Sequence, residues 1–256
     1  MKMSEIKNAV DIKHYSSNVE VQGREKMLDL LESSPIPKDQ LLSNIGLYID
    51  SKNLSRILFM NHLYEKIIDI QGVAMEFGTR WGQNAALLAS LRGIYEPFNR
   101  HRKIIAFDTF TGFPALSSED GHSDLMKLGQ LKTSDNYEEY LDSVLDAQEA
   151  VNPLNHLKKH EICKGDAIVE LEKYLAANKE TIVAFAYFDF DIYEPTKRCL
   201  EMILPRLTKG SVIGFDELND PDSPGETLAL MEVMGLMNIR LKRYRYASRV
   251  SYYVVE

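Results

Sequence analysis

The sequence predicts an α/β fold in which a mostly parallel β-sheet carries helices on both faces. From residue 72 onward, short apolar runs alternate with segments of helical periodicity, which is the pattern of repeated β-α units. Acidic residues follow several of these apolar runs, where the carboxyl ends of parallel strands would meet. The composition, 45% hydrophobic and 27% charged over 256 residues, is that of a globular protein large enough for such a sheet.

The sequence predicts five strands, with helices between and around them. We expect strands at residues 73–77, 103–107, 161–164, 182–188 and 211–215. We expect helices at residues 24–31, 53–70, 84–91, 136–150, 168–177 and 196–207. Pro35 and Pro37 predict a loop after the first helix, because proline disfavours helix at the preceding residue.

These elements divide the chain into an N-terminal helical region, residues 1–71, and an α/β domain, residues 72–256. Residues 109–158 interrupt the alternation and would form a lid at the ligand edge of the sheet. The basic residues within 240–245, followed by an apolar run at 250–255, predict the solvated face of an edge hairpin. Contact with the phosphate of a nucleotide-linked sugar is the alternative for that basic patch.

The bulk composition excludes several classes of protein. A formal net charge of −8 argues against nucleic-acid binding, since the nucleic-acid backbone is contacted by Lys and Arg. No apolar run is long enough to span a membrane, and the first residues lack the apolar region of a secretory signal. The two cysteines provide no disulfide framework. We therefore expect a cytoplasmic protein without a membrane partner.

The run from Phe188 to Pro195 is the most informative stretch of the sequence. Asp189 and Asp191 follow one apolar run, and Asp216 follows another. Carboxylates at the ends of buried strands are costly unless a positive charge or hydrogen bonds compensate them. Oxygen ligands suit Mg²⁺, so these acids predict a metal site. The alternative is carboxylates capped by backbone N–H groups.

Gly78 and Gly82 form a glycine turn between a strand and a helix, where backbone N–H groups can approach a ligand. The turn matches neither the dinucleotide-binding fingerprint nor the P-loop. Asp108, at the end of the next strand, can accept hydrogen bonds from both hydroxyls of a ribose. A ribose acid without phosphate-binding machinery favours an adenosyl ligand without phosphates, of which S-adenosylmethionine is the common one.

On these residues the chain resembles the macrocin O-methyltransferase (TylF-type) family from about residue 72 to the C-terminus. The resemblance is carried by residues 76–78, 107–114, 189–196 and 215–218, and residues 224–227 are similar to one branch of the family. It implies a Rossmann-like class I methyltransferase fold. It also implies methyl transfer to a sugar hydroxyl of a natural product, nucleotide sugar or polysaccharide precursor, dependent on S-adenosylmethionine and Mg²⁺.

The resemblance assigns roles to individual residues. The methionine end of the cofactor would be lined by Glu76, Gly78, Thr79 and Gly82. The ribose would be held by Asp108, with Thr109 and Phe110 beside it, and the adenine edge would be formed by Asp166 and Ala167. Mg²⁺ would be held by Asp189, Asp191 and Asp216, with Glu217 possible in place of one of them. Many relatives carry Asp-Asp at 215–216, so Phe215 leaves the third ligand open.

The general base and the partners remain open at this stage. Asp191 and His122 are both candidates for the base that takes the proton of the acceptor hydroxyl. The α/β core does not need the N-terminal region, so we expect that region to serve a homodimer or larger oligomer. Two alternatives to the methyltransferase are a glycosyltransferase, which would use Asp189-x-Asp191 to bind a metal and a nucleotide, and a non-catalytic methyltransferase-like subunit. The Arg80-Trp81 pair has no assigned role.

Overall fold

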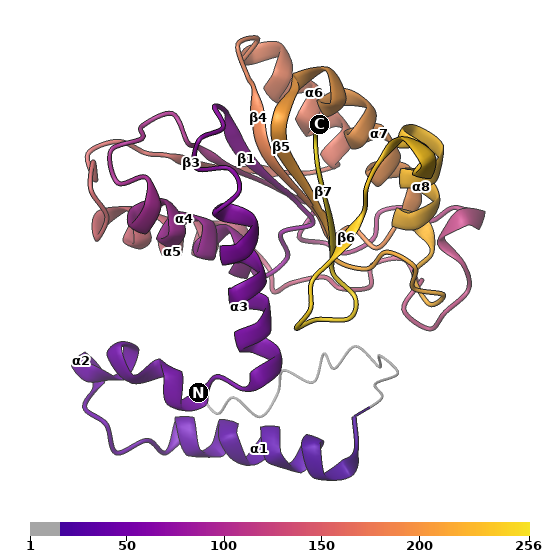
Figure 1. The fold of residues 1–256 in the computed structure, drawn as a ribbon. Helices are drawn as coiled ribbons and strands as arrows, with labels where there is room; N and C mark the ends of the chain where they lie inside the picture. The colour runs from indigo at the N-terminus through magenta and orange to yellow at the C-terminus, as the bar shows by residue number, and fades with distance from the viewer. Residues whose placement is uncertain (1–15) are drawn as a thin grey trace.

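The computed structural model describes residues 16–256, so the first 15 residues of the predicted N-terminal region lie outside the described part. In that part, one seven-stranded sheet has the order β3-β2-β1-β4-β5-β7-β6 (Figure 1). The strands are β1 (Val73–Phe77), β2 (Ile104–Asp108), β3 (His160–Lys164), β4 (Val183–Phe188), β5 (Leu207–Phe215), β6 (Lys242–Arg243) and β7 (Ser251–Val254). The predicted α/β fold is confirmed.

The first five strands are parallel, and the last two close the sheet as an antiparallel edge. Strand β7 pairs with both β5 and β6, which confirms the predicted edge hairpin. Arg240, Arg243 and Arg245 are exposed beside it, as expected for a solvated face.

Helices cover both faces of the sheet, because neighbouring residues of each strand point to opposite sides. Ala74 belongs to the core that α3 (Ser51–Tyr64), α4 (Gln83–Tyr95) and α5 (Tyr137–Ala150) cover. Met75 belongs to the core under α6 (Ala167–Ala177), α7 (Tyr193–Ile203) and α8 (Gly225–Met234) (Figure 1). Helix α8 is the one helix of this layer that the sequence patterns did not predict. Because helices bury both faces, a ligand can reach the sheet only where its strands end or at its outer strands.

The predicted insertion, residues 109–158, contains two kinds of structure. Leu141 and Leu145 of α5 are buried in the core beside α4. Residues 109–136 carry only the short 3₁₀ helix η2 (Ser118–Asp120) and run along the ligand edge. The part of the insertion that can act as a lid is therefore the segment before α5.

The N-terminal region consists of α1 (Asn18–Glu32), α2 (Lys38–Leu41), η1 (Leu42–Tyr48) and α3 (Ser51–Tyr64). Helix α1 begins before the predicted residue 24, because Ser17 and Glu20 form a capping box. Neither α1, α2 nor η1 buries a side chain, and these elements stand apart from the body, joined to it by α3 (Figure 1). Within residues 16–256, every helix is too short or too polar to cross a lipid bilayer.

Helix α3 ends at Tyr64, whereas the periodicity predicted a helix to residue 70. The buried guanidinium of Arg102 donates to the carbonyl oxygens of Ile67 at 2.8 Å and Ile70 at 2.6 Å. After Tyr64 the backbone forms tighter i→i−3 turns, in which Ile67 N–H donates to Tyr64 O at 3.0 Å and Ile70 N–H to Ile67 O at 2.9 Å. Arg102 thus stabilises the turns that follow α3, a contact that the local sequence pattern could not predict.

Candidate active site

A cavity of about 1140 Å³ opens at the carboxyl edge of the sheet, beside the ends of β1, β2, β4 and β5. Its volume exceeds the roughly 300–1,000 Å³ of a typical small-molecule pocket, so two ligands can share it. The predicted site residues that line it are Glu76, Gly78, Thr79, Asp108, Thr109, His122, Asp166, Ala167, Asp189, Asp191, Asp216 and Glu217. Gly82 and Phe110 are not among its lining residues.

Both glycines of the turn after β1 have positive φ, but they serve different neighbours. A Cβ on Gly78, at φ +88°, would lie 2.0 Å from the backbone oxygen of Asp189. A Cβ on Gly82, at φ +76°, would lie 2.2 Å from Cδ1 of Leu141 on α5. Gly78 therefore lets the turn meet the end of β4, whereas Gly82 makes room for a core helix.

Asp108 organises the backbone on either side of the cavity. One carboxylate oxygen accepts the N–H of Arg80 at 2.7 Å, and the other accepts the N–H of Phe110 at 2.6 Å. Both of these residues have positive φ, 48° and 58°, and Phe110 itself is buried in the core. Burial raises the pKa of Asp108, while the two N–H groups act in the opposite direction. Each oxygen keeps a further lone pair for a ligand hydroxyl.

Glu76 and Thr79 present polar atoms without partners to the same half of the cavity. Their side chains are buried, and neither Glu76 Oε2 nor Thr79 Oγ1 has a hydrogen-bond partner. Burial raises the pKa of Glu76 to about 8. Buried polar atoms without partners are costly, so this end of the cavity fits a ligand that carries hydrogen-bonding groups.

The Arg80-Trp81 pair, which had no assigned role, places an aromatic ring at the rim of the cavity. The Trp81 ring meets Tyr137 of α5 edge-on, with centroids 4.8 Å apart, and the Trp81 carbonyl accepts the Tyr137 hydroxyl at 3.0 Å. The ring is 46% exposed and lines the cavity. Because it is the only tryptophan in the chain, its fluorescence reports directly on this cavity.

Asp189, Asp191 and Glu217 form the carboxylate group of the other half of the cavity. Each offers one oxygen, and the three oxygens lie within 4.8 Å of one another. Burial raises the pKa of Asp191 to about 7, and burial together with the neighbouring acids raises the pKa of Asp189 and Glu217 well above the ordinary range. Glu217 Oε1 is buried without a partner. Three carboxylates this close together, with pKa values raised by burial and by one another, form an all-oxygen set that fits a hard divalent cation.

Asp216 stands outside this carboxylate group, although the sequence placed it among the metal ligands. It forms an ion pair with Arg56 of α3 and accepts the Tyr187 hydroxyl at 2.8 Å. Glu217, the residue suggested as a replacement, is the third member of the carboxylate group. Arg249, after β6, pairs with Glu217 and lies 3.2 Å from Asp220. Sequence reasoning missed both arginines, and the need to compensate buried acids was their only signal.

His122 lies on the inserted segment before α5. Its side chain is exposed and lines the cavity, so the structure brings it to the same space as Asp191.

Asp166 caps α6 by accepting the Ile168 N–H at 2.9 Å, and it lines the cavity with Ala167. Apart from Gly82 and Phe110, the predicted cofactor and metal residues thus line one cavity from elements distant in sequence.

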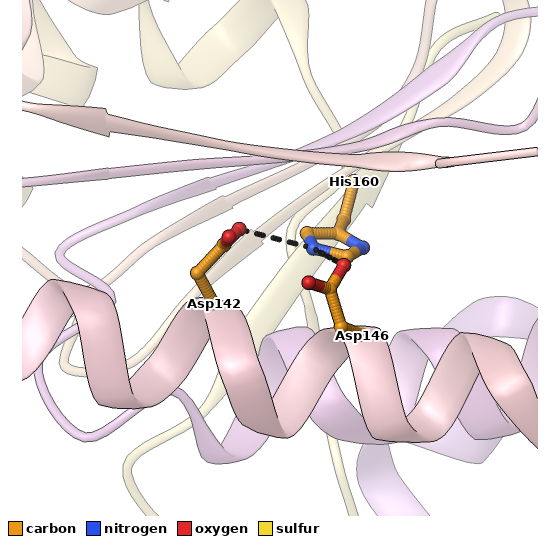
Figure 2. Close-up of side chains that lie close together, drawn as sticks. All are labelled: Asp142, Asp146 and His160. Atoms are coloured by element: carbon orange, nitrogen blue, oxygen red, sulfur yellow. Dashed lines mark hydrogen bonds and ion pairs between the residues drawn. The ribbon is translucent and has the colours of Figure 1, made fainter.

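A second group of polar side chains lies on edge strand β3 and helix α5 (Figure 2). The ring nitrogen Nε2 of His160 lies 3.2 Å from Asp142 and 3.4 Å from Asp146. Lys158 contacts both aspartates, at 2.8 and 3.3 Å, so their charges are compensated within the chain. None of these residues lines the large cavity, and we interpret the group as an ion-pair network that ties α5 to β3.

Comparison with solved structures identifies the family. The calicheamicin methyltransferase CalS11 is 39% identical to this chain, with a TM-score of 0.92 and 94% of each chain covered. The chain belongs to the sugar O-methyltransferase family that contains CalS11. An apo structure of CalS11, described as a TDP-rhamnose 3'-O-methyltransferase, matches at 37% identity, with a TM-score of 0.84 and 94% and 96% of the two chains covered.

As a member of this family, the present chain is an O-methyltransferase, which confirms the enzyme class predicted from the sequence. The O-methyltransferase NovP has the same fold as this chain at 19% identity, with a TM-score of 0.56 and with 78% of this chain and 79% of NovP covered. No protein-family model matches the sequence, and no curated protein matches it either.

Proposed function

We propose that this protein transfers a methyl group from S-adenosylmethionine to a hydroxyl of a sugar joined to a nucleoside diphosphate, with Mg²⁺ as the metal. One observation carries the proposal: a single cavity joins the glycine turn and Asp108 to the carboxylates of Asp189, Asp191 and Glu217. The description of CalS11 as acting on TDP-rhamnose supports the acceptor class.

The cofactor would occupy the half of the cavity next to β1 and β2. Asp108 has free lone pairs for the ribose hydroxyls, and the unpartnered atoms of Glu76 and Thr79 suit the amino group of the methionine part. Asp166 and Ala167, at the start of α6, would border the adenine.

The metal would be held by Asp189, Asp191 and Glu217. When bound, S-adenosylmethionine supplies an electrophilic methyl group, and Mg²⁺ lowers the pKa of an acceptor hydroxyl. The chain contributes alignment, because the buried ends of β1 and β4 set the two halves of the cavity side by side. It also supplies the group that takes the hydroxyl proton.

Asp191 and His122 are the two candidates for this base. Asp191 belongs to the carboxylate group, whereas His122 lies on the inserted segment and lines the same cavity. A large loss of kcat in His122→Gln, with Mg²⁺ affinity unchanged, would assign the proton transfer to His122. A kcat in His122→Gln close to that of the wild type would assign it to Asp191.

Membership in an O-methyltransferase family favours methyl transfer over the glycosyltransferase alternative. The retained carboxylates argue against a non-catalytic subunit, since such a subunit has no need of buried acids that burden its stability.

Calorimetric titration of S-adenosylmethionine, with Mg²⁺ and with EDTA, tests the proposal. The expected result is binding to the wild type that Asp108→Ala abolishes and that Asp189→Ala/Asp191→Ala leaves in place. Methyl transfer to a nucleotide-linked sugar should be lost in both variants. Absence of S-adenosylmethionine binding under every condition would refute the proposal.

We also propose that the chain forms a homo-oligomer through α1, α2 and η1. These elements bury no side chain, yet they expose Leu28, Leu30, Leu42 and Leu47. An isolated helix of 15 residues is marginal in water, so α1 needs a packing partner. A second copy of the same arm supplies apolar residues of the same kind.

A further inference from the structure

The turn at residues 189–193, which carries Asp189 and Asp191, has a strained backbone conformation. Asp191 has a φ of +62°, a conformation that a non-glycine residue adopts only at a cost. The turn follows β4 directly, and it must present two carboxylates to one point. Something outside the turn has to stabilise it.

Two buried carboxylates from distant parts of the chain supply that support. Glu226, in the first turn of α8, is fully buried, and its Oε1 accepts the N–H of Phe190 at 2.8 Å and of Asp191 at 3.3 Å. Asp120, in η2 of the inserted segment, is 2% exposed, and its Oδ1 accepts the N–H of Tyr193 at 2.6 Å. Three backbone donors of the turn are thereby satisfied.

The approach of α8 to the turn depends on Gly225. A Cβ at that position would lie 2.6 Å from the backbone nitrogen of Tyr193 and 2.8 Å from Oδ1 of Asp120. Neither Glu226 nor Asp120 lines the cavity, so neither can touch a substrate there.

Asp120 also connects the turn to the inserted segment. Its second oxygen accepts both the N–H and the hydroxyl of Ser117, at 2.6 and 3.0 Å. His122 follows two residues later and lines the cavity. One carboxylate therefore links the segment that presents His122 to the turn that presents Asp191.

We infer that Glu226 and Asp120 are positioning residues, which hold the turn at residues 189–193 so that Asp189 and Asp191 can bind one divalent cation. This inference rests on the proposed function, because it takes the carboxylate group to be the metal site. Outer hydrogen-bond partners of metal ligands typically change metal affinity by roughly 10- to 100-fold when they are removed.

A matched pair of variants isolates the hydrogen bonds from the charge. Glu226→Gln and Glu226→Leu both lack a carboxylate, but only glutamine keeps an oxygen that can accept the two N–H groups. Mn²⁺ affinity is measured by electron paramagnetic resonance, and S-adenosylmethionine affinity by Trp81 fluorescence. We expect Glu226→Leu to weaken Mn²⁺ binding by roughly 10- to 100-fold. We expect Glu226→Gln to bind Mn²⁺ almost as the wild type does, and both variants to keep their affinity for S-adenosylmethionine.

Asp120→Ala provides a second test that does not depend on the folding of Glu226→Leu. We expect weaker Mn²⁺ binding and faster hydrogen exchange at the amide of Tyr193. Wild-type Mn²⁺ affinity in Asp120→Ala or Glu226→Leu, or equal losses in the Gln and Leu variants, would overturn the inference. If the wild type itself bound no Mn²⁺, the metal site of the proposed function would fail together with it, whereas S-adenosylmethionine binding would still test the other half.

Discussion

The guanidinium of Arg56, on α3, forms an ion pair with the carboxylate of Asp216 at the end of β5. Arg56 also donates to the Tyr187 hydroxyl at 2.6 Å and lies 3.8 Å from Asp189. The N-terminal helical region thus supplies a residue to the active-site cavity. Asp216 is engaged by this arginine, and Glu217 completes the carboxylate group in its place.

Arg56→Met should destabilise the protein by about 1.5–3 kcal/mol, because Asp216 would lose its charged partner in a site of low exposure. Urea unfolding measures the change. Lys52→Met, one helical turn earlier and exposed, is the matched control and should change stability little. Equal effects of the two substitutions would show that the Arg56–Asp216 pair contributes nothing specific.

Arg102→Met should be more damaging, at about 3–5 kcal/mol, since it leaves the buried Glu96 without its positive partner. It also removes the donors to the carbonyl oxygens of Ile67 and Ile70 in the turns that follow α3. The free energy of unfolding is compared with that of Arg100→Met, which removes an exposed arginine. A loss for Arg102→Met no larger than for this control would contradict the assignment.

Gly78→Ala should weaken S-adenosylmethionine binding, because the added Cβ would meet the backbone oxygen of Asp189 and force the turn away from β4. Quenching of Trp81 fluorescence measures the affinity. Gly23→Ala, where nothing lies within 4 Å of the added Cβ, controls for the substitution itself. Normal binding by Gly78→Ala would mean that the close contact has no functional importance.

Glu76 should make the protein less stable as the pH rises from 4.5 toward 8. Its folded-state pKa, raised by burial to about 8, lies above the ordinary value of 4.5. In that range the folded protein holds a proton that the unfolded chain has released, so stability falls by up to ~1.4 kcal/mol per pH unit. Urea unfolding at several pH values should show a shallower decline in Glu76→Gln. If the free energy of unfolding depended on pH in the same way in the wild type and in Glu76→Gln, Glu76 would not be the source of the decline.

Leu28→Ser/Leu30→Ser should reduce the molar mass in solution to that of a monomer, because the substitutions make the α1 surface polar. Light scattering after size-exclusion chromatography measures the mass. Leu128→Ser, at an exposed position of the inserted segment, should leave the assembly intact. A monomeric wild type would exclude the proposed oligomer.

Much of the fold could be predicted because its signals are local. Strands β1, β2, β4 and β5 each contain an apolar run, and each helix of the α/β domain except α8 shows its own periodicity. The acids Asp108, Asp189 and Asp191 were likewise recognisable, because Asp108 ends β2 and the other two lie within three residues of the end of β4. The carboxyl ends of parallel strands share one edge of the sheet.

The features that the sequence did not predict share one cause: they depend on contacts between residues far apart in the chain. Arg102 bonds the carbonyl oxygens in the turns after α3, and Gly82 makes room for Leu141 of α5. The periodicity of a segment contains no information about a side chain that arrives from elsewhere in the chain.

The sequence by itself determined the α/β class, the family resemblance and the acids that could bind a metal, because these follow from local composition, periodicity and motif. Only the tertiary structure decided that Glu217 rather than Asp216 joins Asp189 and Asp191, and that Arg56 compensates Asp216. Charge compensation and ligand geometry depend on distances across the fold. Such distances exist only once the strands and helices have packed together.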